Sequence, residues 1–225
     1  MPDSEQGEQP ASITKNLALV LGLPWIEIIA EAWKFGRKVL RGLTDEGVYE
    51  VIEYDSTLEL HDSHGKEATF TKRKKIRYLQ NDIIAYQDYG WGDGEQFVDY
   101  QAKPGVPVDR YKIGYKTYIL ISLRDVKNRG DTDEFNIQWK IKNGFLKPDG
   151  FWETDVSSRT RRLRMSVVFP KGRPPRNVRL VENNIRKTTN LGSDTVQRTA
   201  NGHWKITWEK YKPRLFEHYI IRWDW

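Results

Sequence analysis

The sequence predicts an all-β protein, an antiparallel β-sandwich with immunoglobulin-like topology as a candidate, preceded by an N-terminal amphipathic helix. Three observations support this prediction. Apolar and polar residues alternate at period two in five segments. Turn-forming Gly, Pro, Asn and Asp residues separate these segments at short intervals. No long helical pattern lies between any two strand candidates, which argues against a parallel α/β sheet.

The first 44 residues differ from the remainder of the chain. Residues 1–12 are polar, and we expect a disordered tail. Residues 13–44 have apolar residues at helical spacing, with Trp25, Ile29 and Leu40 opposite a charged stripe. The predicted helix has three open uses: packing on the protein's own sheet, which is favoured, contact with a partner or second copy, or binding to a membrane surface.

Residues 45–225 are predicted to form the sandwich. The clearest strand is Phe135–Ile141, in which every second residue is apolar. Four more segments share this alternation: Tyr115–Leu123, Leu163–Phe169, Trp204–Trp208 and Tyr219–Trp225. Weaker strand candidates are Val48–Tyr54, Thr57–His61, Ala68–Leu79, Ile83–Asp88 and Gln96–Gln101.

Composition limits the class of protein. The 225 residues include 28 aromatic side chains, enough for a large core, and no cysteine. The absence of cysteine excludes disulfides and thiolate metal sites and fits a reducing compartment. The N-terminus has no basic region typical of a signal peptide, and no apolar run approaches ~20 residues, so we expect a cytoplasmic protein.

Charge is distributed unevenly along the chain. Residues 156–225 hold 16 Lys and Arg against 5 Asp and Glu, a net charge of +11, whereas residues 1–155 carry a net charge of −5. Seven arginines lie between Arg159 and Arg179, with no acidic residue among them. Such an asymmetry indicates an anionic partner or an acidic surface within the same chain, for example Asp131, Asp133 and Glu134.

Strand parity selects the basic residues that could contact a partner. We call them the basic stripe: Arg73, Lys75, Arg77, Arg162, Arg164, Arg173 and Arg176. Three readings of the stripe remain open: a solvated edge strand protected by charge, a site for an acidic protein partner, or a nucleic-acid-binding surface.

A glycine-rich loop carries the best group of carboxylates, Asp88, Asp93 and Glu95, with Trp91 among them. Their spacing differs from an EF-hand, so neither a metal nor another cofactor is predicted. A hydrolase or carbohydrate-active site on these carboxylates is an alternative, as is a loop that contacts a partner through Trp91. No phosphate-binding, nucleophile-elbow or zinc-protease motif occurs in the sequence.

These observations favour a non-enzymatic binding module. Its basic stripe and glycine-rich loop would engage an acidic protein partner or another anionic ligand. The first alternative is a nucleic-acid-binding protein, and the second is a hydrolase that uses Asp88, Asp93 and Glu95. A homo-oligomer is a further expectation from the amphipathic helix.

Overall fold

The structure is a computed structural model that describes residues 47–192 and 194–225. The predicted tail (1–12) and amphipathic helix (13–44) lie outside the described residues. The described part is all-β, which confirms the predicted class. None of it forms a helix long and apolar enough to cross a bilayer.

The strands form three sheets. The largest has the spatial order β12 (Val196–Arg198), β13 (Trp204–Tyr211), β9 (Thr160–Phe169), β1 (Tyr49–Leu60), β2 (Glu67–Tyr78), β7 (Thr132–Lys142) and β4 (Glu95–Lys103). A four-stranded sheet has the order β11 (Lys187–Asn190), β10 (Arg176–Glu182), β14 (His218–Asp224) and β8 (Asp149–Asp155). A three-stranded sheet has the order β3 (Ile83–Gly90), β6 (Lys116–Lys127) and β5 (Val106–Ile113).

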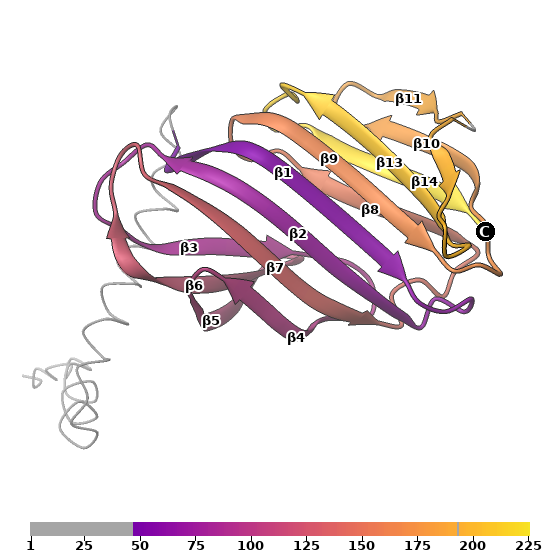
Figure 1. Ribbon diagram of the computed structural model, residues 1–225, viewed down its shortest axis with the longest axis horizontal. Coiled ribbons are helices and arrows are strands. Elements are labelled where there is room, and N and C mark those ends of the chain that lie inside the picture. Colours follow the sequence, from indigo (N-terminus) through magenta and orange to yellow (C-terminus); the bar gives the residue numbers. More distant parts are fainter. Residues whose placement is uncertain (1–46, 193) are drawn as a thin grey trace, which may run out of the picture. The chain divides into compact units, whose positions relative to one another are not determined.

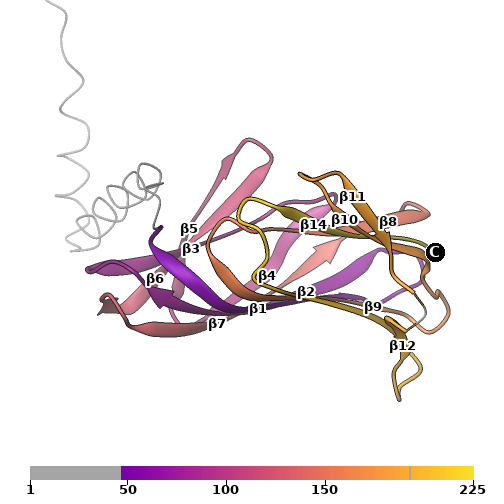
Figure 2. The same ribbon diagram turned by 90° about the horizontal axis from the view of Figure 1, so that it is seen from above.

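Both smaller sheets pack on one face of the seven-stranded sheet, which we call the inner face (Figures 1 and 2). Tyr86 of β3 stacks on Phe135 of β7 with ring centroids 4.0 Å apart. Trp223 of β14 meets Phe169 of β9 edge-on at 5.2 Å. The described chain is therefore a sandwich in which one long sheet is covered by two short ones.

One strand pair differs from the predicted antiparallel arrangement. Strands β1 and β9 lie side by side in the middle of the large sheet and are parallel. The other paired strands of the described residues are antiparallel. The sequence gives no sign of this pairing, because strand alternation has period two in either direction. The chain between β1 and β9 runs through β2–β8, which belong to both layers, so strands and not a helix make the crossover that parallel strands require.

Strand boundaries follow the sequence where one face is buried. Val48–Tyr54 and Thr57–His61 join into the single strand β1, which has a bulge between Val51 and Glu53. Strands β5, β8, β10, β11 and β12 were not predicted. In β5 all residues but one are exposed, so no apolar alternation marks it.

Trp139 of β7 is buried on the inner face, as its strand pattern predicts, with 2% of its surface exposed. Its ring lies 4.4 Å from Phe70 and 4.7 Å from Phe97, measured between centroids. The predicted register of β7 is thus confirmed.

Replacing Trp139 with alanine should lower the free energy of unfolding by ~3–5 kcal/mol, because it empties the centre of the aromatic packing. Urea denaturation would measure the loss. The control is Gln138→Ala, the exposed neighbour on the other face of β7, which should stay within ~0.5 kcal/mol of the parent. Equal costs for the two variants would contradict the assigned register.

Candidate ligand-binding groove

The basic stripe meets acidic side chains of the same sheet. Arg73 on β2 faces β1 on one side and β7 on the other. Its guanidinium lies 2.5 Å from Glu53, 2.6 Å from Asp55 and 3.1 Å from Glu134, measured between nitrogen and oxygen. Hydrogen bonding to Arg73 lowers the pKa of Glu53. Arg73 therefore joins three strands through carboxylates of the chain itself.

Other stripe residues are paired in the same way. Arg162 lies on β9, next to β1, and contacts Glu53 and Asp55, each at 3.2 Å. Arg164 reaches Glu209 on β13 at 2.7 Å, and Arg77 forms an ion pair with Glu50. Most of the predicted stripe is thus matched by acidic residues on its own face of the sheet.

The remaining stripe residues differ from one another. Arg173 lies over the Trp225 ring, 3.5 Å from its centroid, and donates a hydrogen bond to the Ser63 carbonyl oxygen. Arg176 is exposed at the start of β10, and Lys75 lies on the outer face of β2. Neither forms an ion pair within the described residues. The stripe is consequently not brought together as one continuous cationic surface.

The three predicted carboxylates lie in different environments. Asp88 is buried and forms an ion pair with Lys72. Asp93 is exposed and pairs with Lys147 at 3.1 Å, and Glu95 is exposed at the start of β4. Across residues 47–192 and 194–225, no three His, Cys, Asp or Glu side chains gather closely enough to hold a metal ion.

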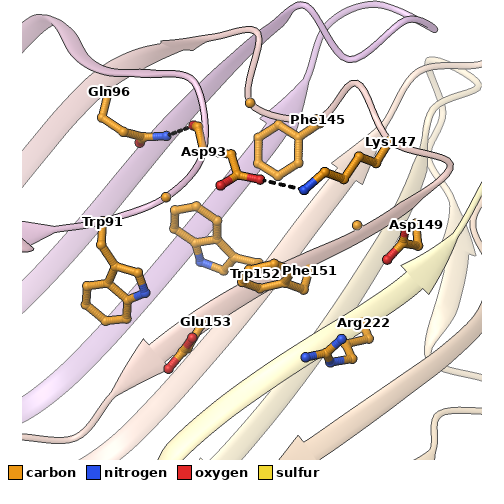
Figure 3. Close-up of a pocket in the computed structure, with 13 residues that line it drawn as sticks. Trp91, Asp93, Gln96, Phe145, Lys147, Asp149, Phe151, Trp152, Glu153 and Arg222 are labelled. Carbon is orange, nitrogen blue, oxygen red and sulfur yellow. Dashed lines mark hydrogen bonds and ion pairs between the residues drawn. The ribbon is translucent and has the colours of Figure 1, made fainter. Parts of the chain in front are cut away.

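Trp91, the predicted contact residue of this loop, lines a cavity beside the loop (Figure 3). The cavity has a volume of about 120 Å³, and Phe151 and Trp152 contribute further rings to its wall. The Asp93–Lys147 ion pair lies on one side of it, and Glu153 and Arg222 lie on the other.

A second cavity of about 30 Å³ adjoins the first, and the two share Trp91, Trp152 and Glu153. We call the two cavities together the aromatic groove. Lys72 and Lys74, on the inner face of β2, line the second cavity together with Tyr54, Tyr89 and Asp155. The groove therefore combines aromatic walls with two lysines that point into the sandwich.

Lys72 is neutralised in place. Its ammonium group pairs with Asp88 and donates a hydrogen bond to the Tyr89 carbonyl oxygen. Asp88 also accepts a hydrogen bond of 2.9 Å from the Tyr100 hydroxyl. A buried ion pair of this kind needs such additional partners, because desolvation of the two charges opposes their attraction.

Two irregularities in β4 bring Tyr100 to Asp88. The register shifts between Glu95 and Val98 and again between Val98 and Gln101, where Phe97 and Asp99 have positive φ angles of 62° and 52°. These bulges let both Phe97 and Tyr100 stack on Trp139, although positions three apart would face opposite sides of a regular strand. The strained backbone of the bulges thus places Tyr100 where its hydroxyl can donate to Asp88 of the buried ion pair.

A second ion pair joins the two smaller sheets beside the groove. Lys116 of β6 lies 2.6 Å from Asp155 of β8, which also accepts a 2.8 Å hydrogen bond from the Tyr89 hydroxyl. The Lys116 ammonium group stands over the Trp91 ring, 4.7 Å from the centroid. Burial opposes the charge of Lys116, but Asp155 outweighs it and raises the pKa of this lysine.

Lys74 has no such partner among the described residues. It is 8% exposed, and its amine lies over the Tyr54 ring, 4.8 Å from the centroid. It forms no ion pair and no hydrogen bond with the described residues. Burial, together with the positive charge of Lys72, lowers the pKa of Lys74 to about 8. Around neutral pH this side chain therefore exists as both ammonium and free amine.

The groove also contains polar atoms without hydrogen-bond partners within the described residues. They are the Trp152 and Trp139 indole nitrogens and the Gln96 amide oxygen, all buried. Buried polar atoms are nearly always bonded in proteins, so unsatisfied groups at a cavity are typical of a site that a ligand or water completes.

Lys72 and Lys74 are not part of the basic stripe, although their positions in the sequence carry a signal. On β2 they share parity with Ala68, Phe70 and Ile76, and these apolar residues face the core. Two lysines on the apolar face of a strand are an exception that indicates a buried polar site. The basic stripe instead contains Arg73, Lys75 and Arg77, which lie on the opposite face of β2.

Reversing the charge of Arg162 should destabilise the fold, because Arg162→Glu places a third carboxylate beside Glu53 and Asp55. We expect a loss of ~1–3 kcal/mol in the free energy of unfolding. Arg176→Glu, at an exposed position without a recorded ion pair, is the matched control and should change it by less than ~0.5 kcal/mol. Similar values for both variants would contradict a structural role for the ion pairs.

Removing the Lys74 charge should stabilise the protein in a pH-dependent way. A pKa of about 8 in the folded state, against an ordinary value of 10.5, means that the folded state binds fewer protons between these values. Below pH 8 the parent bears the full cost of the buried charge, at most on the order of 3 kcal/mol. Lys74→Met should therefore be more stable than the parent at pH 7, and this gain should disappear toward pH 10.5.

Urea denaturation of parent and variant at several pH values measures the Lys74 effect. Lys75→Met removes the same charge from the exposed face of β2 and should show no such pH-dependent gain. A gain for Lys74→Met that is equal at pH 7 and pH 10.5 would show that the amine titrates normally.

Comparison with known proteins gives no family for this chain. No family model and no curated protein matches it. Among solved structures, it is similar to one described as a putative protease from Parabacteroides distasonis, with 11% sequence identity and a TM-score of 0.46. The match covers 79% of this chain but 40% of that protein. A likeness at this level carries no argument about function.

Proposed function

We propose that this protein is a non-enzymatic binding protein whose ligand, a small flat molecule with an acidic group, occupies the aromatic groove. The observation that carries this proposal is the Lys74 amine, which lines the groove and forms no ion pair or hydrogen bond with the described residues. A buried ammonium group is costly unless it is paired, and an acidic ligand would supply the missing partner.

The walls of the groove favour a flat ligand. Trp91, Phe151 and Trp152 line the larger cavity, and Tyr54 and Tyr89 line the smaller one. Aromatic side chains bind planar groups by offset or edge-on stacking. Arg222 at the larger cavity offers a second cation for an acidic group.

The dimensions of the groove favour a ligand of the size of one substituted ring. The smaller cavity, about 30 Å³, has room for a single functional group, and the larger one is about 120 Å³. This size argues for a metabolite-like ligand in the groove.

The leading sequence-based prediction, an acidic protein partner at the basic stripe, stays a prediction, and so do its two alternatives, a nucleic-acid-binding protein and a hydrolase. The basic stripe could still contact an acidic protein or a nucleic acid, but Glu53, Asp55, Glu134 and Glu209 already neutralise much of it. The hydrolase alternative has less support, because Asp88 is engaged by Lys72 and Tyr100. The expected cytoplasmic location, immunoglobulin-like topology and homo-oligomer also stay predictions.

Calorimetric titration with benzoate and with neutral benzamide tests the proposal. The parent should bind benzoate, and bind benzamide about tenfold more weakly, because only the anion pairs with a cationic amine. Lys74→Met should lose about tenfold in benzoate affinity, whereas Lys75→Met, on the other face of the same strand, should bind as the parent does. Equal affinity for the two compounds, or an undiminished Lys74→Met, would rule the proposal out.

A further inference from the structure

We propose that Lys74 captures its ligand covalently: the groove takes a small aromatic aldehyde with an acidic group, and the Lys74 amine forms an imine with its carbonyl carbon. This inference rests on the proposed function of the aromatic groove and names the chemical class of its ligand.

Lys74 differs from the other lysines in and beside the groove in having no carboxylate partner within the described residues. Lys72, Lys116 and Lys147 are held by Asp88, Asp155 and Asp93, respectively. A carboxylate partner favours the ammonium form, which has no lone pair for attack on a carbonyl group. Lys74 alone among these four has no carboxylate partner within the described residues, so it is the one able to supply a free amine.

The position of the Lys74 amine favours attack on a ligand held in the groove. Lys74 lines the smaller cavity, where Tyr54 packs against it and where there is space for a single functional group. The adjoining larger cavity can hold the aromatic ring of the ligand between Trp91 and Trp152. Arg222 also lines the larger cavity, so a ligand that carries both groups can place its acidic group at Arg222 and leave its carbonyl group for Lys74, whereas a ligand with an acidic group alone pairs with Lys74.

Lys74 is present in part as the free amine. Burial, and after it the charge of Lys72, lower its pKa to about 8 against the opposing effect of Asp88 and Asp155, so the reactive form is present at neutral pH. Lysine used for imine formation in proteins is commonly activated by burial or by a neighbouring cation, and Lys74 has both, since Lys72 lies two residues away on the same face of β2.

The reaction needs no reagent beyond the aldehyde. The Lys74 nitrogen adds its lone pair to the carbonyl carbon, and the former carbonyl oxygen receives a proton to give a carbinolamine. The carbon–oxygen bond then breaks, the oxygen leaves as water, and the nitrogen releases its remaining proton as the C=N bond forms. One amine and one carbonyl group thus yield one imine and one water molecule.

The same cavity contains a carboxyl group that can exchange the protons of this reaction. Glu153 lines both cavities and forms a hydrogen bond with the His218 ring on the neighbouring strand. A carboxyl–imidazole pair can protonate the departing hydroxyl group and accept the proton from nitrogen. Glu153 therefore has the chemistry of a proton-transfer group for both steps.

Reductive trapping tests the inference on the full chain. The protein is incubated with para-formylbenzoate and cyanoborohydride at pH 7.5, and the product is analysed by intact-mass and peptide mass spectrometry. We expect one adduct per chain, located on Lys74, formed on the order of 100-fold faster than on exposed lysines because of the larger free-amine fraction. Adducts distributed over exposed lysines, with no preference for Lys74, would overturn the inference.

Two controls exclude an indirect effect of the substitutions. Lys74→Arg keeps the charge but cannot form an imine under these conditions and should lose the adduct, whereas Lys75→Arg should keep it. In the unmodified protein, excess para-(hydroxymethyl)benzoate, which lacks a carbonyl group, should slow labelling of Lys74 alone. Retention of the adduct by Lys74→Arg would overturn the inference.

The non-reactive analogue also separates this inference from the proposed function. If para-(hydroxymethyl)benzoate binds in calorimetry and para-formylbenzoate gives no Lys74 adduct, imine capture is wrong and the binding proposal stands. If Lys74 is labelled although benzoate and the analogue do not bind, the acidic-ligand proposal fails and the reactive lysine stands. Absence of both binding and labelling overturns both.

Discussion

The buried ion pair between Lys72 and Asp88 connects the two layers of the sandwich around the groove. Lys72 belongs to the large sheet and Asp88 to the three-stranded sheet, and both side chains are almost fully buried. Attraction alone does not offset the desolvation of two such charges, so further polar partners are required. Tyr100 supplies one of them, and it reaches Asp88 because β4 is bulged. The irregular geometry of β4 therefore supplies a polar partner to the charge buried in the core.

The groove follows from covering one long sheet with two short ones. The three-stranded sheet packs over Phe135, and the four-stranded sheet packs over Phe169. Between them the inner face of β2 is covered only in part, and Lys72 and Lys74 line the cavity left there. Trp91, directly after β3 of the three-stranded sheet, and Trp152, in the middle of β8, contribute to the walls. Of the two lysines on this face, Lys72 pairs with Asp88 of the covering sheet, and Lys74 lines the smaller cavity.

The burial of a side chain could be predicted from the sequence where the alternation of its own strand determines which face it occupies. The alternation around Trp139 predicts its burial, because neighbouring side chains of a strand point to opposite faces. The exposed strand β5 could not be predicted, because it has no apolar alternation. The β4 bulges at Phe97 and Asp99 could not be predicted either, because they depend on how β4 pairs with β7. The parity of Lys74 predicts that it points inward, but its lack of a carboxylate depends on which strands cover β2. The position of this lysine could thus be predicted from the sequence, whereas its unpaired state could not.

The uneven charge of the sequence is explained within the large sheet by the parallel pairing of β1 and β9. This pairing places Glu53 beside Arg162 and Asp55 beside Arg164, although more than 100 residues separate them along the chain. Acidic residues of the first part of the chain thereby meet arginines of the second part on the outer face of one sheet. The arginine-rich run that suggests an external anion is in large part matched from within, whereas Lys74 is not. Charges counted along the sequence indicate that the arginine-rich run is unpaired and give no such sign for Lys74. The order of the strands in the sheet determines which charges meet.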